Sequence, residues 1–532
     1  MHDEAGINSE HKSEGKALLR HGSTLSLLTL VSRVLGLARE MTKAAFLGTT
    51  ALSDAFSVAF MIPNLFRRLF AEGSIAVAFI PTFKEYLIEN NEENIKEFLS
   101  CILTFLSFFV TLAVIAGIII SPFVIRFFGL QEFNEAVFLT RMMFPFLAFI
   151  SLAAFFQGIL NSLKIFAPSG LGPILLNVFT ILCAYGLSPH TQNPARAMAV
   201  GVIIGGFAAA AIQLPFILAH KSRMRFFFTS LVKAVNNPGT KKVLRLIAPT
   251  IIGMAAYQVN DLVSTALAGN AGEGIVSSLQ FSLRLQELML GVFAVSIGTV
   301  LLPDLAGHAK SQQWDIFNQR LKSAINIIAF IAIPVTFFAM AQGEILIRLL
   351  FQTRTFDEES VRLTLSAFYF HMPGLYFIAL NRIIAPAFYA QSDTKSPTIA
   401  GLISFVINIT LAAALVSHFK GSGIALALTI ASAANTAALL VFLRKNPAIN
   451  IGITLKSALA YTLKMILFSA LATIPVLFFS GTLLEFFAGN SRLVSLGVPL
   501  LINVFVFCAV GLTLLAVTKD KQLLGIKKMF AS

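Results

Sequence analysis

An apolar segment near the N-terminus contains two adjacent arginines. Residues 63–73 read PNLFRRLFAEG, with DAFSVAFMI before them and SIAVAFI after them. Arg67, Arg68 and Glu72 therefore lie within a stretch long enough to cross a bilayer. Because an arginine at the centre of a membrane helix costs about 2.5–3.5 kcal/mol, two in succession imply a partner, a water-filled cavity or a ligand.

Charged residues also interrupt the neighbouring apolar segment. The sequence SRVLGLARE, residues 32–40, carries Arg33, Arg39 and Glu40. On a helix the two arginines point in directions about 120° apart, and Glu40 returns to the face of Arg33. Asp54 begins the next apolar segment. These residues would place several charges inside one bundle of helices.

The second half of the chain has a similar set. QFSLRLQELM carries Arg284 and Glu287 three positions apart, and ALNRIIAP carries Arg382. We expect Arg284 to pair with Glu287, and Arg68 with Glu72, because both spacings bring side chains together on a helix. Cations still outnumber carboxylates after this pairing. A cavity lined by guanidinium groups suits phosphate or carboxylate oxygens, which the planar group binds in pairs.

Each of these residues also has a structural interpretation. Arg33 and Arg67 could extend to the membrane surface from a helix end. The two predicted ion pairs could lock helices together, and Asp54 could cap the second helix. The sequence alone leaves both interpretations open.

The composition is that of a membrane protein. The 532 residues are 56% hydrophobic and 12% charged, with a mean hydropathy of +0.80, whereas soluble domains are about 25% charged. We predict an all-α polytopic fold. The sequence has no HExxH, P-loop or GxSxG motif and no metal-binding cluster. We therefore expect a transporter rather than an enzyme, without a cofactor, driven by an ion gradient or the membrane potential.

Fourteen segments are long and apolar enough to span a membrane. The predicted spans are 22–47, 52–83, 98–128, 137–163, 167–187, 196–219, 243–269, 273–305, 323–350, 364–390, 397–417, 421–443, 456–479 and 493–518. About 24 of the 40 lysines and arginines fall on one side, which the positive-inside rule assigns to the cytoplasm. Both termini are then cytoplasmic, and the net charge of +14 needs no nucleic-acid partner.

The first twelve predicted spans form an internal repeat. FAEGSIAVAFIPTF is similar to VFAVSIGTVLLPDL, and the segments starting at Pro145 and Pro373 correspond, as do Asn177 and Asn408. Parallel repeats of this kind build two-lobed transporters with a site between the lobes. The predicted parts are a polar tail (1–16), an N-lobe (17–219), a basic cytoplasmic linker (220–242), a C-lobe (243–445) and a C-terminal region with two extra helices and a basic tail (446–532).

The motifs SRVLGLARE, SDAF and PNLFRRLFAEGSIAVAFIPTF together resemble the MurJ (MviN) family of lipid II flippases. LRLQELMLGVFAVSIGTVLLP and IIAPAFYA are also similar to that family. It belongs to the multidrug/oligosaccharidyl-lipid/polysaccharide (MOP) exporter superfamily. The resemblance covers the first twelve helices, and in the family the last two form a groove for the lipid tail.

The resemblance implies roles for the membrane charges. Headgroup binding falls on Arg33, Arg39, Arg284 and Arg382, and supporting or gating roles fall on Glu40, Asp54, Arg67, Arg68, Glu72 and Glu287. Some members of the family resemble sodium-binding transporters and have acids at positions that correspond here to Ser264 and Ala412. We therefore predict no metal site, and the remaining candidates for sodium ligands are Asp261, Asn408 and Thr429.

The predicted function is movement of lipid II from the inner to the outer leaflet of the bacterial cytoplasmic membrane, by alternating access through a cationic cavity. We expect a monomer that contacts membrane lipids, with wall-synthesis proteins as candidate partners. One alternative is an exporter of another polyprenyl-pyrophosphate-linked oligosaccharide, which would need the same cations. A multidrug antiporter coupled to protons or sodium is the other, and the excess of arginines argues against it.

Overall fold

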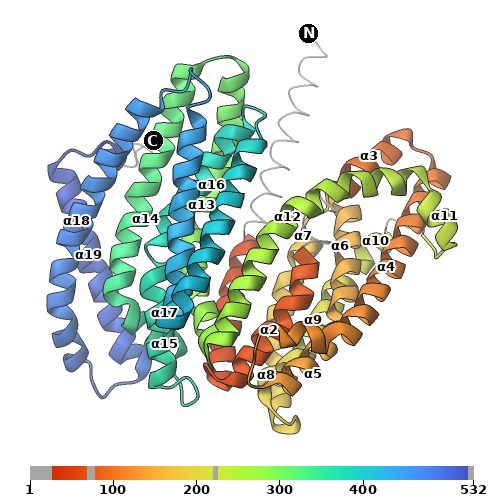
Figure 1. Cartoon of the computed structure of the whole chain (residues 1–532), viewed down its shortest axis with the longest axis horizontal. Helices are drawn as coiled ribbons and strands as arrows, with labels where there is room; N and C mark the ends of the chain where they lie inside the picture. Colours follow the sequence, from red (N-terminus) through yellow and green to blue (C-terminus); the bar gives the residue numbers. More distant parts are fainter. Residues whose placement is uncertain (1–26, 69–77, 220–225, 525–532) are drawn as a thin grey trace. The chain divides into compact units, whose positions relative to one another are not determined.

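The described part of the chain is built from helices. The computed structural model describes the backbone of residues 27–68, 78–219 and 226–524, and the side chains of these ranges except 249–257, 292–300 and 453–454. No strand occurs within these ranges, and Figure 1 shows the helices in chain order. The chain divides into two compact units, Met1–Val259 and Asn260–Ser532. The predicted all-α class is confirmed.

Unit 1 contains the first half of the chain. A helix at residues 27–47 comes first. The helices that follow are α2 (Ala51–Arg67), α3 (Ile80–Glu89), α4 (Glu92–Arg126), α5 (Phe133–Met143), α6 (Phe146–Ser162), α7 (Ala167–Gly170), α8 (Gly172–Leu187), η3 (Ser188–His190), α9 (Pro194–Ala211), α10 (Leu214–Ala219), α11 (Leu231–Asn236) and α12 (Pro238–Ala271). Because α12 continues to Ala271, the division between the units falls inside it.

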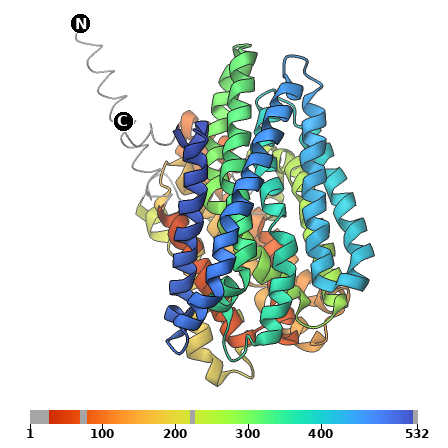
Figure 2. The same cartoon turned by 90° about the vertical axis from the view of Figure 1, so that its left-hand side faces the viewer.

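Unit 2 contains longer helices. They are α13 (Ile275–Lys310), α14 (Trp314–Phe351), α15 (Glu358–His371), α16 (Gly374–Tyr389), α17 (Lys395–Leu443), α18 (Ile451–Phe486), η4 (Leu493–Gly497) and α19 (Val498–Val517). Lys420 has φ 48° and ψ −127°, so α17 is two helices joined at a break. The break falls between the predicted spans 397–417 and 421–443. Figure 2 shows the C-terminal helices, with α18 packed against both α14 and α19.

The helices agree with a membrane-spanning chain. Among the described residues, eight helical segments are long and apolar enough to cross a membrane, or nine if α15 and α16, bent by 45°, form one span. A described helix also lies within each of the fourteen predicted ranges. The count of fourteen membrane crossings, and the predicted boundaries of the lobes and linker, stay predictions.

Local sequence signals explain several helix starts. The Asn91 side chain accepts hydrogen bonds from the backbone N–H groups of Glu93 and Asn94, which caps α4. Asn193 caps α9 in the same way, and Pro194 supplies a first residue with φ already suited to a helix. Such caps satisfy N–H groups that have no partner inside the helix.

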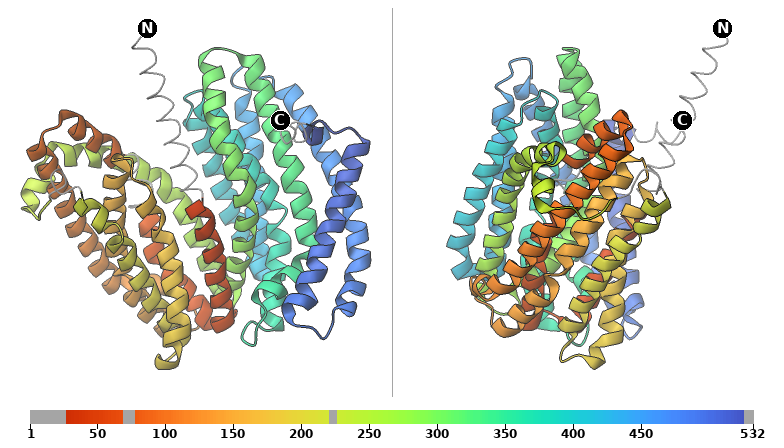
Figure 3. Two further views of the ribbon diagram at one scale, coloured as in Figure 1. Left: turned by 180° about the vertical axis from the view of Figure 1, so that it is seen from behind. Right: turned by 90° about the vertical axis from the view of Figure 1, so that its right-hand side faces the viewer.

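Two glycines allow α8 and α9 to pack at close range, and Figure 3 shows these helices from behind. A Cβ added to Gly201 would lie 2.6 Å from the carbonyl oxygen of Phe179 and 2.6 Å from the Cα of Thr180. A Cβ added to Gly205 would lie 2.7 Å from the Cα of Leu176. Glycines four residues apart permit this backbone contact between membrane helices.

The internal repeat is visible in two asparagines. Asn177 on α8 donates to the carbonyl oxygen of Ser32 on the first helix at 3.2 Å. Asn408 on α17 donates to the side chains of Asn260 at 2.8 Å and Ser264 at 3.0 Å, both on α12. In each unit, the asparagine of the fifth predicted helix of the repeat therefore bonds to the first. The sequence correspondence reflects the same helix contact made twice.

The segment before α12 is attached to α4. The backbone N–H of Phe227 donates to the hydroxyl of Ser100, and that of Thr229 to the hydroxyl of Thr104, both at 3.0 Å. The ring of Phe226 contacts the rings of Phe155 and Phe156 on α6. These bonds satisfy the backbone of an irregular segment, which membrane surroundings would otherwise penalise.

Candidate functional site

The first helix holds Arg39 and Glu40 in a close ion pair. Arg39 Nη2 lies 2.7 Å from Glu40 Oε1, and the two side chains are 19% and 12% exposed. The guanidinium carbon lies 5.6 Å from the ring centre of Phe60 on α2, within cation–π range. Within the described ranges Arg39 makes no other hydrogen bond. Since a guanidinium group has five N–H donors, most of its capacity remains for an anionic ligand.

Two further charges lie buried beside this pair. Lys43 Nζ donates to the hydroxyl of Ser57 on α2 at 2.5 Å, and both Lys43 and Asp54 are almost fully buried. Asp54 is not the cap of α2, because Thr50 occupies that position and accepts from the backbone N–H of Ser53. The interpretation of Asp54 as a helix cap is therefore wrong. Its burial in the first turn favours an electrostatic role.

The arginines of α2 lie at its C-terminal end. Arg67 Nε donates to the side chain of Asn64 at 2.7 Å, and Arg67 and Arg68 are both half-buried. Their positive charge suits the negative end of the helix dipole. Glu72, the predicted partner of Arg68, lies outside the described residues. Arg33 is half-buried on the first helix.

Not every membrane cation is available for a ligand, and Arg141 on α5 shows why. Pro122 has no N–H, so it cannot bond to the carbonyl of Ile118 four residues earlier in α4. Arg141 Nε donates to that carbonyl at 3.2 Å, and Ser121 donates to it at 2.9 Å. Arg141 therefore satisfies a backbone group that a proline has exposed.

In unit 2, Arg284 and Glu287 form the predicted pair on α13. Arg284 Nη1 lies 3.3 Å from Glu287 Oε2, and the side chains are 32% and 61% exposed. The opposite face of α13 is buried against α15, where Ser282 lies 2.7 Å from Nδ1 of His371 and Gln286 donates to the carbonyl of His371. The pairing is confirmed. The helix thus presents its charged side away from its packed side.

Arg382 on α16 is the exposed cation of this unit's predicted site. Its neighbour Asn381 donates to the carbonyl of Ser432 at 3.1 Å and accepts from Thr436 at 2.8 Å, which fixes α16 against α17. Arg382 itself has no hydrogen bond or ion pair within the described part of the chain. A fixed helix carrying an uncommitted guanidinium group is suited to bind an anion.

The candidate sodium ligands make separate contacts. Asn408 bonds to α12, whereas the Thr429 hydroxyl donates to the carbonyl of Phe370 at 2.6 Å and supports the break between α15 and α16. Asp261 is half-buried on α12. The oxygen of the Asn408 side chain is buried and accepts no hydrogen bond within the described ranges. The absence of a sodium site stays a prediction.

Several strong ion pairs join residues that no local sequence pattern relates. Lys464 on α18 lies 2.6 Å from Asp520, whose carboxylate also accepts from Tyr461 at 3.1 Å. Burial alone would raise the pKa of the Asp520 carboxyl, but the Lys464 ammonium and the backbone N–H of Gln522 hold that pKa below its usual value. The carboxylate therefore ties the segment after α19 to α18.

Two bidentate pairs join helices within the separate units. Arg196 on α9 binds both oxygens of Glu135 on α5, at 2.8 and 2.7 Å. Arg348 on α14 binds both oxygens of Glu358 on α15, at 2.6 and 2.7 Å. In each unit, these arginines are committed to protein carboxylates, so we separate them from the candidate ligand-binding arginines.

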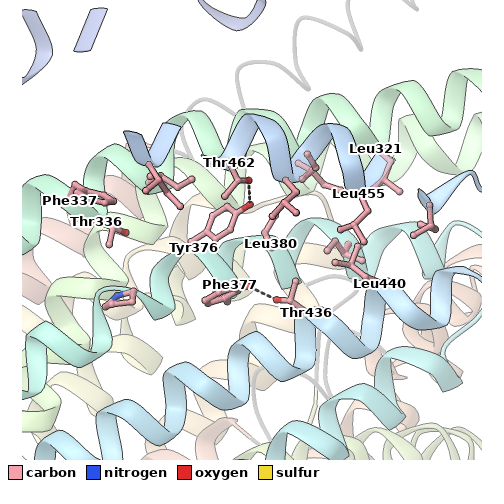
Figure 4. A pocket seen from close by; sticks show the side chains of 18 residues that line it. Leu321, Thr336, Phe337, Tyr376, Phe377, Leu380, Thr436, Leu440, Leu455 and Thr462 are labelled. Carbon is pink, nitrogen blue, oxygen red and sulfur yellow. Dashed lines mark hydrogen bonds between the residues drawn. The ribbon is translucent and has the colours of Figure 1, made fainter. Parts of the chain in front are cut away.

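An apolar pocket of about 390 Å³ lies within unit 2, between α14, α16, α17 and α18. Leu321, Phe337 and Leu455 are among the residues that line it, and Figure 4 shows their side chains. A hydrogen bond of 2.8 Å joins the hydroxyls of Tyr376 and Thr462 across it. The rest of the lining is almost wholly hydrocarbon, which suits a lipid chain.

Comparison with known proteins gives one consistent family. The family model described as lipid II flippase MurJ matches residues 43–497. A protein of Treponema pallidum named as a probable lipid II flippase MurJ is 45% identical over 511 residues, which cover 95% of this chain and 97% of the relative.

Solved structures agree with the fold. A structure titled lipid II flippase MurJ, inward closed conformation, matches with a TM-score of 0.77 at 25% identity, covering 94% of this chain and 99% of that one. An inward-facing multidrug resistance transporter of the MATE family and MOP superfamily matches with a TM-score of 0.66 at 15% identity, covering 80% and 96%. The second match shows the fold alone.

Proposed function

Because the chain belongs to the MurJ family, we propose that this multi-pass membrane protein moves lipid II from the inner to the outer leaflet of the bacterial cytoplasmic membrane. It acts as a transporter and not as an enzyme. The observation that carries the proposal is the family match over residues 43–497, which includes Arg284 and Arg382, together with the relative of Treponema pallidum that covers 95% of the chain. Both termini face the cytoplasm in this proposal.

The arginines of the two units would bind the headgroup. Lipid II carries a pyrophosphate and a peptide with carboxylates, and guanidinium groups bind such oxygens through charge-assisted hydrogen bonds. Arg39 supports this role because most of its N–H donors are uncommitted, and Arg382 because none is bonded within the described residues. Arg33 and Arg284 would complete the set. Glu40 and Glu287 would hold the arginines in position while no substrate is bound.

The remaining charges would support the cavity or its gates. Lys43 on the first helix and Asp54 on α2 are buried and would set the electrostatic potential of the cavity. Arg67, Arg68 and Glu72 would act at the end of α2. We propose that these charges line a cavity that opens to one side of the membrane at a time.

The membrane potential would supply the energy. A potential that is negative inside favours outward movement of anions by about 2.3 kcal/mol per charge per 100 mV. The same potential would draw the empty arginines back toward the cytoplasm. No bound cofactor takes part in this proposal, and a sodium ion is not required.

The pocket of unit 2 would hold part of the polyprenyl tail. Its lining of leucine, isoleucine and phenylalanine side chains suits a hydrocarbon chain, and α18 forms one of its walls. We propose that the protein works as a monomer among membrane lipids. Wall-synthesis proteins remain candidate partners.

The test is depletion of the protein in cells, followed by addition of a hydrolase that cleaves lipid II only at the outer surface. Cleavage should fall while total lipid II rises, because the precursor accumulates on the inner leaflet. A control strain expresses the wild-type chain from a second copy. Full cleavage after depletion, in a strain without another flippase, would favour a different polyprenyl-linked substrate.

A further inference from the structure

Unit 1 contains an apolar pocket that the proposed function does not use. Its volume is about 430 Å³, and it lies between α4, α6 and the first turns of α12. Phe105 and Ala113 of α4, Phe155 of α6 and Val243 of α12 are among its lining residues. Among the described residues of the lining, Thr240 supplies the one polar side chain. A pocket of this kind suits a hydrocarbon chain.

The wall that α4 forms in the pocket of unit 1 has a counterpart in the wall that α14 forms in the pocket of unit 2. Ile102, Val110 and Ala113 line the pocket of unit 1. Ile325, Ile333 and Thr336 of α14 line the pocket of unit 2 and follow one another at the same spacing. Because α4 and α14 are the third helices of the two predicted repeats, these three lining positions correspond between the two walls.

In each unit a further helix lines the pocket along one face, and we call it the covering helix. Residues 240, 243, 244 and 247 of α12 line the first pocket, and residues 455, 458, 459 and 462 of α18 line the second. Both sets follow the i, i+3, i+4, i+7 spacing of one helix face. Each covering helix comes directly after a six-helix repeat, so α12 covers the first repeat as α18 covers the second.

The fourth helix of each repeat forms a third wall. It is broken at a proline in both units, between α5 and α6 at Pro145 and between α15 and α16 at Pro373. Leu147 and Phe155 line the first pocket beyond the break, and Pro373 and Tyr376 line the second. Three walls of each pocket therefore come from equivalent helices, and α17 adds a fourth wall in unit 2 only.

Cations lie beside the pocket-lining faces of both covering helices. Lys241 and Arg245 are exposed on α12, next to Thr240 and Leu244, and Lys456 is exposed on α18, next to Leu455. Within the described ranges Arg245 and Lys456 have no hydrogen bond or ion pair. These side chains lie at the helix ends that we expect to be cytoplasmic. A lipid with an apolar chain and a phosphate at its inner-leaflet end matches both features.

We propose that the pocket of unit 1 is a second binding site for the polyprenyl chain of the substrate. The inference rests on the proposed function, because it extends to unit 1 the chain-binding role proposed for the pocket of unit 2. A polyprenyl lipid could then engage either unit through its tail, with its phosphate near Arg245 or Lys456. An acyl chain of a membrane phospholipid is the occupant that the test must exclude.

Photocrosslinking of the full-length protein in nanodiscs of phosphatidylcholine tests this directly, with radiolabelled undecaprenyl phosphate as the probe and phosphatidylglycerol as the added competitor. A benzophenone amino acid replaces Phe105 in unit 1, Phe337 in unit 2 or, as a control, Phe123, which is 81% exposed on α4. We expect labelling from the first two positions and only background from the third. Added phosphatidylglycerol should not compete.

A filling substitution gives the matched control. Ala113→Phe, at a position that lines the pocket, should reduce labelling from position 105 by about tenfold, because the ring occupies space that the lipid chain would fill. Ile115→Phe, at an exposed position of the same helix, should leave it unchanged. Labelling from position 337 should survive both changes.

The outcomes separate this inference from the proposed function. Labelling at 337 with only background at 105 overturns the second site and leaves the proposed function intact. Background at both positions counts against any chain-binding pocket. Labelling at 105 that phosphatidylglycerol displaces would assign the pocket to phospholipid and overturn the inference.

Discussion

Replacement of Arg39 should weaken substrate binding and, as a separate effect, lower the stability of the protein. In Arg39→Ala the substrate headgroup loses a charge-assisted hydrogen bond, worth about 1.5–3 kcal/mol. That loss corresponds to about 10–150-fold weaker binding. The same change removes the partner that lies 2.7 Å from the Glu40 carboxylate, whose side chain is 12% exposed. We therefore expect a loss of stability of about 1–3 kcal/mol as a separate effect.

A second substitution separates the two effects. Glu40→Gln in the Arg39→Ala background removes the carboxylate charge, so thermal unfolding in detergent should recover toward the wild type. Binding of lipid II should not recover, because the guanidinium group is still absent. Arg39→Lys should give intermediate binding, since an ammonium group keeps the charge but not the planar pair of donors.

Arg141→Ala is the matched control, because this arginine bonds to the α4 backbone. It should lower the unfolding temperature and leave the affinity of the folded protein for lipid II unchanged. The reasoning fails if Arg39→Ala with Glu40→Gln binds lipid II as tightly as the wild type. It also fails if Arg141→Ala weakens binding as much as Arg39→Ala does.

The remaining predictions concern the second unit, helix packing and pH. Arg284→Ala should abolish growth when it is the sole copy while membrane insertion stays normal, which complementation and immunoblotting will show. Gly201→Ala should lower the unfolding temperature because its Cβ meets the backbone of α8, whereas Gly186→Ala, with nothing within 4 Å, should not. Asp520→Asn should destabilise the protein by removing the charge that pairs with Lys464. Because the folded pKa of Asp520 is lowered, its stabilising effect should be full above about pH 4 and disappear as the pH falls through the folded pKa. Unfolding temperatures of both proteins, measured across that range, check the sign.

The helical class and the repeat could be predicted from the sequence because both rest on local patterns. Long apolar runs indicate helices whose side chains contact lipid or other helices on every side. The correspondence of Asn177 with Asn408 was visible in the sequence, and the structure gives its cause in two equivalent hydrogen bonds. The pair Arg284–Glu287 followed from helical spacing alone.

The long-range partners of charged residues could not be predicted in this way. Lys464 and Asp520 belong to different parts of the chain, and no periodic pattern relates them. Arg141 gave no signal of its own, although the proline in α4 exposes the carbonyl that it binds. Asp54 could be assigned to a cap by residue type, but Thr50 precedes it and takes that role. When two neighbouring residues can both cap a helix, the sequence alone does not show which of them does so.

Reconstitution of the purified protein into liposomes with lipid II in both leaflets tests the central claim most directly. The measured quantity is the fraction of lipid II cleaved by a hydrolase added outside, with and without an imposed membrane potential. The account predicts that the wild type exposes the inner-leaflet pool, faster with a potential that favours movement of anions toward the hydrolase, and that Arg39→Ala and Arg284→Ala expose no more than protein-free liposomes. Transport by those variants at the wild-type rate, or no exposure by the wild type, would contradict it.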